Sequence, residues 1–262
     1  MSQQPTHGAA PQLRTLFERA VALHQQGDLV RARILYEEVL KIRPTHADAL
    51  HLLGVIAAQT NHPARAVELI ERSIEFDSTN FAAYGNLGSA LYALKRLHEA
   101  LPAYDRAIAL KRDFDQAYVL RGNCLYELKR YEAALASYEG AIAIKPDFAE
   151  AHSNRGNVLQ ALGQFDAAVA SYEQAILLKP DFAEAHSNKA NVLRQLDQYD
   201  AALASYDRAL AIDAKFVPAH FNRGVVLNQL RLLPAALASY DAAIAIDPIL
   251  PKRISIGRYS GC

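Results

Sequence analysis

The chain has 262 residues, of which 51% are hydrophobic, and its 28 basic side chains equal its 28 acidic ones in number. A net charge of zero gives no bulk attraction to nucleic acid or to an anionic membrane, so neither is predicted as a partner. No apolar run approaches the roughly 18 residues that a membrane-spanning helix needs. Residues 1–12 also lack the basic and apolar segments of a secretory signal, which favours a cytoplasmic protein.

The first segment, residues 1–12, contains no Asp, Glu, Lys or Arg and no periodic apolar pattern. Gln, Pro, Gly and Ala dominate it, and such a composition does not bury a core. We therefore predict a flexible leader there.

From Leu13 onward the sequence repeats itself every 34 residues. The clearest case is the phrase AEAHSN, which begins at Ala149 and again at Ala183. Self-similarity at a fixed period of about 20 to 50 residues is the signature of a solenoid. Seven copies follow one another without insertion or deletion, at residues 13–46, 47–80, 81–114, 115–148, 149–182, 183–216 and 217–250.

Each copy reads as two packed helices when its positions are numbered from 1 to 34. Small residues occupy position 8 and Ala occupies position 20, whereas position 24 carries a large side chain. Large side chains therefore face small ones, as close packing requires. Apolar spacing is helical on both sides of a polar or glycine break, and a proline at position 32 ends four of the second helices: Pro44, Pro146, Pro180 and Pro248. The pattern predicts an all-α solenoid of seven helical hairpins.

Copy two and the end of the chain depart from this pattern. Copy two has Ala57 at position 11, Pro63 at position 17 and Ile70 at position 24, which suits a terminal region where packing demands relax. Residues 251–262 have no helical period and include three basic residues, so we expect an irregular basic tail. Because solenoids need a polar terminal cap, its absence indicates either a sequence that is cut short or a last apolar face that a partner covers, and self-association through the uncapped last copy is one form of such cover.

The pattern resembles the tetratricopeptide repeat family over residues 13–250, with Leu-Gly at positions 7 and 8 of copies two and three, Ala at 20, an aromatic at 24 and Pro at 32. The resemblance implies a right-handed superhelix whose first helices line a concave surface, with a protein or peptide as the partner. Position 7 departs from the family pattern, because it is basic in the later copies. We expect the stems of these side chains to pack while their charges reach water.

The candidate binding residues lie on the face of the first helix that is opposite to its packed positions. Asn recurs there at position 6, as Asn86, Asn154, Asn188 and Asn222, and at position 9, as Asn123, Asn157 and Asn191. Asn is a mediocre helix former, so two interpretations stand. Either the amides are repeat consensus bonded to the neighbouring hairpin, or they pair with the backbone of an extended peptide. In the second case the side-chain preference comes from Tyr92, Tyr126, Arg194 and Gln195.

No sequence motif indicates catalysis, a metal or a cofactor. A Gly-rich phosphate loop, HExxH, a CxxC pair and GxSxG are all absent. His152, His186 and His220 recur at the repeat spacing, but packed helices about 8 to 10 Å apart hold such rings too far apart to share one zinc. We assign these histidines to packing. Two cysteines make no disulfide framework, and Cys124 is expected to be a small buried side chain.

Two classes of function follow from these observations. The first is a non-catalytic scaffold that binds an extended peptide or partner protein in the concave groove. The second comes from the phrase KPDFAEAHSN and the position-6 asparagines, which are similar to the repeat region of O-linked N-acetylglucosamine transferases. That resemblance implies a substrate-recognition arm of a larger glycosyltransferase whose catalytic domain is missing from this sequence. The carboxylate clamp of related cochaperones is not expected, because position 5 carries no Lys.

Overall fold

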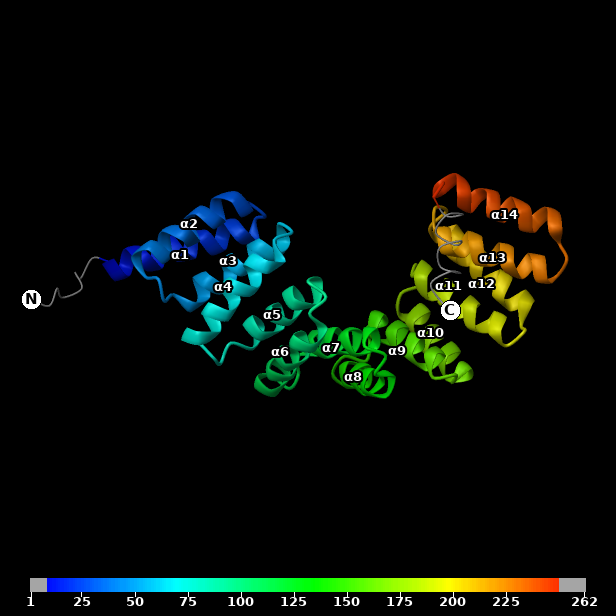
Figure 1. Cartoon of the computed structure of the whole chain (residues 1–262), viewed down its shortest axis with the longest axis horizontal. Coiled ribbons are helices and arrows are strands. Elements are labelled where there is room, and N and C mark those ends of the chain that lie inside the picture. The colour runs from blue at the N-terminus through cyan, green and yellow to red at the C-terminus, as the bar shows by residue number, and fades with distance from the viewer. Residues whose placement is uncertain (1–8, 250–262) are drawn as a thin grey trace, which may run out of the picture. The chain divides into compact units, whose positions relative to one another are not determined.

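The computed structural model describes residues 9–249, and all regular structure in this range is helical (Figure 1). Fourteen helices follow one another there: α1 (Ala9–Gln25), α2 (Leu29–Ile42), α3 (Ala47–Gln59), α4 (Pro63–Phe76), α5 (Phe81–Ala93), α6 (Leu97–Leu110), α7 (Asp115–Glu127), α8 (Tyr131–Ile144), α9 (Ala149–Ala161), α10 (Phe165–Leu178), α11 (Ala183–Gln195), α12 (Tyr199–Ile212), α13 (Val217–Gln229) and α14 (Leu233–Ile246). The predicted all-α fold of seven hairpins is confirmed. None of these helices is long and apolar enough to cross a membrane.

The helix bounds keep one register along the chain. From copy two onward the first helix occupies positions 1–13 and the second helix positions 17–30, as in α9 and α10. One boundary needs correction. Helix α1 begins at Ala9, so residues 9–12 are helical and do not belong to the flexible leader that was predicted for residues 1–12. The rest of that leader and the predicted basic tail lie outside the described residues.

The turn inside each hairpin has the same backbone conformation in all seven copies. Position 15 has a positive φ every time, at Gly27, Asn61, Lys95, Lys129, Gly163, Asp197 and Arg231. In copies one, two, three, five, six and seven the following N–H bonds back to the carbonyl at position 11, as from Gln164 to Leu159 over 2.9 Å. This pair of features is the left-handed helix end of the Schellman type. It ends the first helix in glycine and non-glycine copies alike.

The core of each hairpin lies where its two helices touch. Tyr172 is fully buried, and its ring lies so close to Gly156 that a Cβ atom at that glycine would come within 2.7 Å of it. Tyr104 lies equally close to Gly88, at 2.6 Å. The predicted contact between the large position 24 and the small position 8 is therefore confirmed.

The described chain divides after Lys129 into two compact units. Both units stack their hairpins in the same way, with the second helix of one copy against the first helix of the next, as α4 packs on α5 and α10 on α11. The first helices also touch in series: α3 with α5 and α5 with α7 in one unit, α9 with α11 and α11 with α13 in the other. Equivalent positions of successive first helices are thereby brought together.

Candidate functional site

The candidate residues share one face of the first helices, which we call the ladder face and define by positions 6, 9, 12 and 13. Residues three or four apart on a helix lie on the same side of it, and first helices within a unit touch in series. The members come from five helices: Asn86 and Tyr92 on α5, Asn123 and Tyr126 on α7, Asn154 and Asn157 on α9, Asn188, Asn191, Arg194 and Gln195 on α11, and Asn222 on α13.

The amides of the ladder face bond from one repeat to the next. Asn188 Nδ2 donates to Asn157 Oδ1 over 3.1 Å, and the Tyr172 hydroxyl donates to the same oxygen over 2.7 Å. A side-chain carbonyl has two lone pairs, so both acceptor sites of Asn157 are used. The arrangement recurs one repeat later, at distances of 3.0 and 2.6 Å, among Asn222, Tyr206 and Asn191.

The position-6 amides retain part of their hydrogen-bonding capacity. Asn188 and Asn222 are half-buried and not fully open to solvent, and each uses one N–H on the preceding repeat. Within residues 9–249, their carbonyl oxygens and second N–H groups have no partner. Bonding to the neighbouring hairpin, the first of the two interpretations, therefore accounts for only one N–H of each amide.

Asn86, in the first unit, is supported differently. Asn86 Nδ2 donates to His51 Nε2 over 2.8 Å, across the contact between α5 and α3. Burial lowers the pKa of His51 and outweighs a smaller opposite effect of the Asp48 charge. The ring therefore stays neutral, and its Nε2 atom can accept the hydrogen bond. Asn123 and Asn154 are half-buried and also engaged in interactions.

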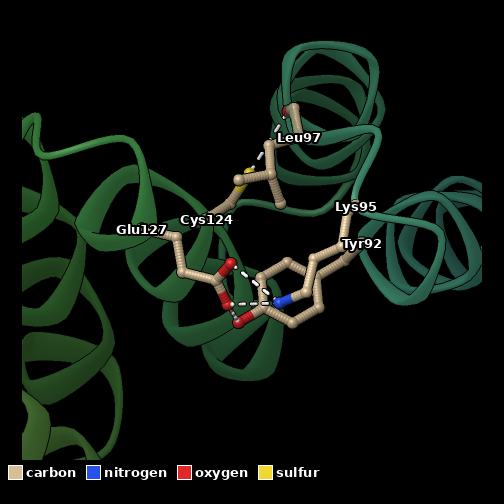
Figure 2. Close-up of polar contacts among 5 residues, drawn as sticks. All are labelled: Tyr92, Lys95, Leu97, Cys124 and Glu127. Atoms are coloured by element: carbon tan, nitrogen blue, oxygen red, sulfur yellow. Dashed lines mark hydrogen bonds and ion pairs between the residues drawn. The ribbon is translucent and has the colours of Figure 1, made fainter. Parts of the chain in front are cut away.

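Tyr92 is held by a carboxylate of the following copy, as Figure 2 shows. Its hydroxyl donates to Glu127, and Lys95 Nζ forms an ion pair with the same carboxylate over 2.9 Å. Burial and then the Glu127 carboxylate raise the pKa of Tyr92, while the bonds from Tyr92 and Lys95 lower the pKa of Glu127. The phenol is therefore oriented, and its hydroxyl is occupied.

The contact of Tyr92 belongs to a set that sequence reasoning missed. Three contacts join position 12 of one copy to position 13 of the next: Tyr92 to Glu127, His24 to Gln59 at 3.1 Å, and Gln160 to Gln195 at 2.9 Å. In copies two to six, position 13 alternates accordingly, with Gln or Glu in copies two, four and six and Ala in copies three and five, whereas copies one and seven both carry Gln. That alternation is visible in the sequence, but it can be interpreted only once the structure shows that positions 12 and 13 of neighbouring copies meet.

Arg194 is the cation of the ladder face. Its Nε atom is buried and has no hydrogen-bond partner among the described residues. Gln195 beside it is exposed, and Tyr126 on α7 is 37% exposed. Because the protein covers this Nε–H group, the structure does not present it to a ligand, and Gln195 and Tyr126 are the more accessible side chains.

The recurring histidines bond to the backbone. His152 Nε2–H donates to the Pro146 carbonyl over 2.9 Å, and His186 and His220 make the equivalent contact in their copies. Each bond ties position 4 to position 32 of the preceding copy. In the part of the chain that the structure describes, no three His, Cys, Asp or Glu side chains are grouped as metal ligands.

Cys124 is fully buried, as expected for a small core side chain. Its Sγ–H donates to the Leu97 carbonyl over 3.2 Å (Figure 2). Burial, with a smaller effect of Glu127, raises the pKa of the thiol to about 11, so the reactive thiolate is suppressed at neutral pH.

Basic side chains at position 7 reach carboxylates at position 25 of the preceding copy. The pairs are Arg121 with Asp105 at 2.6 Å, Lys189 with Glu173 at 2.8 Å, and Arg223 with Asp207 at 2.7 Å. The basic side chains are mostly covered, whereas the carboxylates are 56% to 57% exposed. The stems therefore pack against the protein, and the charged ends lie near water. Each such ion pair contributes about 0 to 1 kcal/mol to the stability of the fold.

Comparisons with known families agree with this repeat geometry. A family model described as "TPR repeat" matches residues 122–163. Models described as "Tetratricopeptide repeat" match residues 23–91, 81–114, 153–216 and 214–249. Together they cover most of the seven copies.

Curated relatives match over part of their length. The chain is 32% identical over 89 residues to the type IV pilus assembly protein PilF of Pseudomonas aeruginosa, a match that covers 34% of each protein. It is 27% identical over 96 residues to Tetratricopeptide repeat protein 7A of Homo sapiens, covering 37% of this chain and 11% of that protein. The chain thus spans about a third or less of these relatives.

Solved structures share the fold. The crystal structure of MamA is 29% identical, with a TM-score of 0.59 over 63% of this chain and 96% of that chain. The structure of YrrB, described as a TPR protein with an unusual peptide-binding site, is 26% identical, with a TM-score of 0.56 over 70% and 94% of the two chains. The 34-residue hairpins, their common turn and these matches show that the chain belongs to the tetratricopeptide repeat family of protein–protein interaction repeats.

Proposed function

We propose that the chain is a non-catalytic scaffold that binds an extended peptide or partner protein along the ladder face. The observation that carries this proposal is unused hydrogen-bonding capacity on neighbouring repeats, at Asn188 and Asn222. An extended backbone offers N–H and C=O groups in turn, and a side-chain amide complements both. The similarity to YrrB, with its described peptide-binding site, supports the same class of ligand.

The bonds between repeats favour binding because they orient the amides in advance. Asn188 is held by Asn157, which is itself held by the buried Tyr172. Ordering a mobile side chain on binding costs about 0.5 to 1.5 kcal/mol. A ladder that is already ordered avoids most of this cost.

Replacing Asn188 and Asn222 together by Leu tests the proposal. Leu stands at position 6 in copies two and four, as Leu52 and Leu120, so the helix accommodates it. For a peptide selected from a random library on the immobilised wild-type chain, we expect binding about 10- to 100-fold weaker, because at least two hydrogen bonds of about 0.5 to 1.5 kcal/mol each are lost. Fluorescence polarisation measures the affinity.

The control is the same peptide with its backbone amides methylated one at a time. Methylation at a residue that pairs with an asparagine should weaken binding to the wild-type chain but not to the Leu variant. Unchanged affinity in the Leu variant, combined with a lower melting temperature, would assign the asparagines to repeat cohesion alone.

The second candidate, an arm of a larger glycosyltransferase, rests on the sequence resemblance. The relatives reported above are not described as glycosyltransferases. An open reading frame that continues past Cys262 into a sugar-nucleotide domain would support it, and a stop codon there would contradict it. The cytoplasmic location likewise stays a prediction, which a fluorescent fusion would check.

A further inference from the structure

A cavity of about 770 Å³ opens between α2 and α4, with α3 contributing to its lining. Its apolar surface comes from all three helices and includes Leu40, Leu53, Ile56 and Leu69. None of its lining residues belongs to the ladder face, since they fall at other positions of the repeat. The volume lies within the range of about 300 to 1,000 Å³ that is typical of ligand pockets.

Two shortened side chains explain why the cavity opens in copy two. Position 11 is Leu in the six other copies and position 14 is Leu in copies three to seven, whereas copy two has Ala57 and Thr60. In copy six, Leu193 is buried and Leu196 packs against the hydrophobic core. The Thr60 hydroxyl instead bonds back to the Ile56 carbonyl over 2.8 Å. The irregularity of copy two is therefore a defined hollow and not simply relaxed packing.

Cations line both sides of this hollow. Arg33 and Lys41 lie on α2, Arg65 and Arg72 lie on α4, and Glu37 is the one acidic residue of the lining. Position 21, where Arg33 stands, is Val or Leu in the six other copies. Within residues 9–249, Lys41 and Arg72 form no ion pair, whereas Arg33 lies 3.9 Å from Glu37 and Arg65 is paired outside the hollow. An apolar hollow with a positive rim complements a ligand that is both apolar and anionic.

The arrangement of the cations indicates an elongated ligand. Along α2, Arg33 and Lys41 are eight residues apart, which is about 12 Å at the helical rise of about 1.5 Å per residue. Along α4, Arg65 and Arg72 are seven residues apart, or about 10 Å. Two carboxylates seven residues apart on a partner helix are separated by about the same distance, so they can meet a cation near each end of the hollow. A fatty acid has a single carboxylate and meets the cations at one end only.

We propose that this hollow docks an acidic amphipathic helix of a partner protein. The apolar side chains of this helix enter between α2 and α4, and its carboxylates pair with the cations near both ends of the hollow. This site is separate from the ladder face, so the scaffold has two docking surfaces of different chemistry.

The test uses the full chain and a fluorescein-labelled helical peptide of about 15 residues, with Leu along one face and Glu beside it at seven-residue spacing. Ala57→Leu with Thr60→Leu restores the side chains of the later copies and fills the hollow. We expect this variant to keep its helical content and to bind the peptide about tenfold more weakly or worse. Lys41→Glu with Arg72→Glu, both at exposed positions, should weaken binding to a similar degree without changing the melting temperature.

The matched control is Arg208→Glu, because Arg208 is the exposed residue of copy six at the position of Arg72. It should bind the peptide as the wild type does. The Asn188→Leu, Asn222→Leu variant should also bind it normally, which separates this site from the ladder face.

Two results with the acidic peptide would overturn the proposal. The first is equal binding by the wild type, the Ala57→Leu, Thr60→Leu variant and the Lys41→Glu, Arg72→Glu variant. The second is equal binding of a peptide with Lys in place of Glu. Binding of laurate without binding of the acidic peptide would assign the hollow to a fatty acid and also overturn it.

Discussion

Two buried tyrosines at the same repeat position differ in one hydrogen bond. Tyr172 gives its hydroxyl to Asn157 over 2.7 Å, whereas the equally buried Tyr36 has no partner for its hydroxyl within residues 9–249. Position 9 accounts for the difference, because it is Asn in copy five and Val21 in copy one. Burial raises the pKa of Tyr36 to about 12, and an unpaired buried hydroxyl costs about 1 to 3 kcal/mol of stability.

Replacing each tyrosine by Phe should therefore have opposite effects. Tyr36→Phe is expected to raise the unfolding free energy of copy one by up to about 1 kcal/mol, and Tyr172→Phe to lower that of copy five by about 0.5 to 1.5 kcal/mol. Amide hydrogen exchange in α2 and α10 measures both, since a repeat array opens in parts. Equal losses of protection in the two variants would contradict this account of the hydroxyls.

The turn between the two helices of a hairpin keeps one backbone conformation whatever residue occupies position 15. Position 15 is left-handed in every copy but is glycine only in Gly27 and Gly163. A residue with a Cβ atom pays about 1 to 2 kcal/mol for that conformation. The other five turns are therefore strained, yet they keep the same helix end.

We predict that Gly163→Ala lowers the unfolding free energy by about 1 kcal/mol, while Arg231→Gly raises it by up to about the same amount. Both positions lie in open space or at the surface, so packing changes little. Urea unfolding followed by circular dichroism compares the midpoints. Destabilisation by Arg231→Gly would mean that chain entropy in the unfolded state outweighs the strain.

At the scale of the whole molecule, α14 presents an apolar surface at the last described repeat. Leu233 and Leu237 are 55% and 60% exposed, and Ile244 is 40% exposed. Their spacing of four and seven residues places them on one stripe of the helix. Contiguous exposed apolar surface marks interaction sites, which supports the proposal that the chain self-associates through copy seven.

Sedimentation velocity over a range of concentrations tests this proposal. We expect the wild-type chain to show a concentration-dependent dimer, and Leu233→Lys with Leu237→Lys to weaken dimerisation by at least about tenfold, since about 1.4 kcal/mol is one decade and each buried Leu contributes about 1.5 to 3 kcal/mol. Leu177→Lys, on the exposed face of α10, is the control and should dimerise normally. A wild-type chain that stays monomeric throughout would contradict the proposal.

The sequence by itself determined the hairpins. The period of 34 residues predicted the helices, their breaks and the contact of Tyr172 with Gly156, which the structure confirms. These features are local: helical periodicity extends over a few turns, and the two halves of a hairpin are separated by a short turn. The same short-range pattern placed the candidate asparagines on one helix face, because residues three or four apart share a side.

Only the tertiary structure decided what those side chains meet. The bonds of Asn188 to Asn157 and of Tyr92 to Glu127 join residues 31 and 35 positions apart on different helices. They depend on how one hairpin is rotated and shifted against the next, which apolar spacing leaves open. The hollow beside Ala57 is also a property of three helices at once. A short side chain appears in the sequence as a missing Leu, but whether neighbours collapse into the gap is decided by their packing.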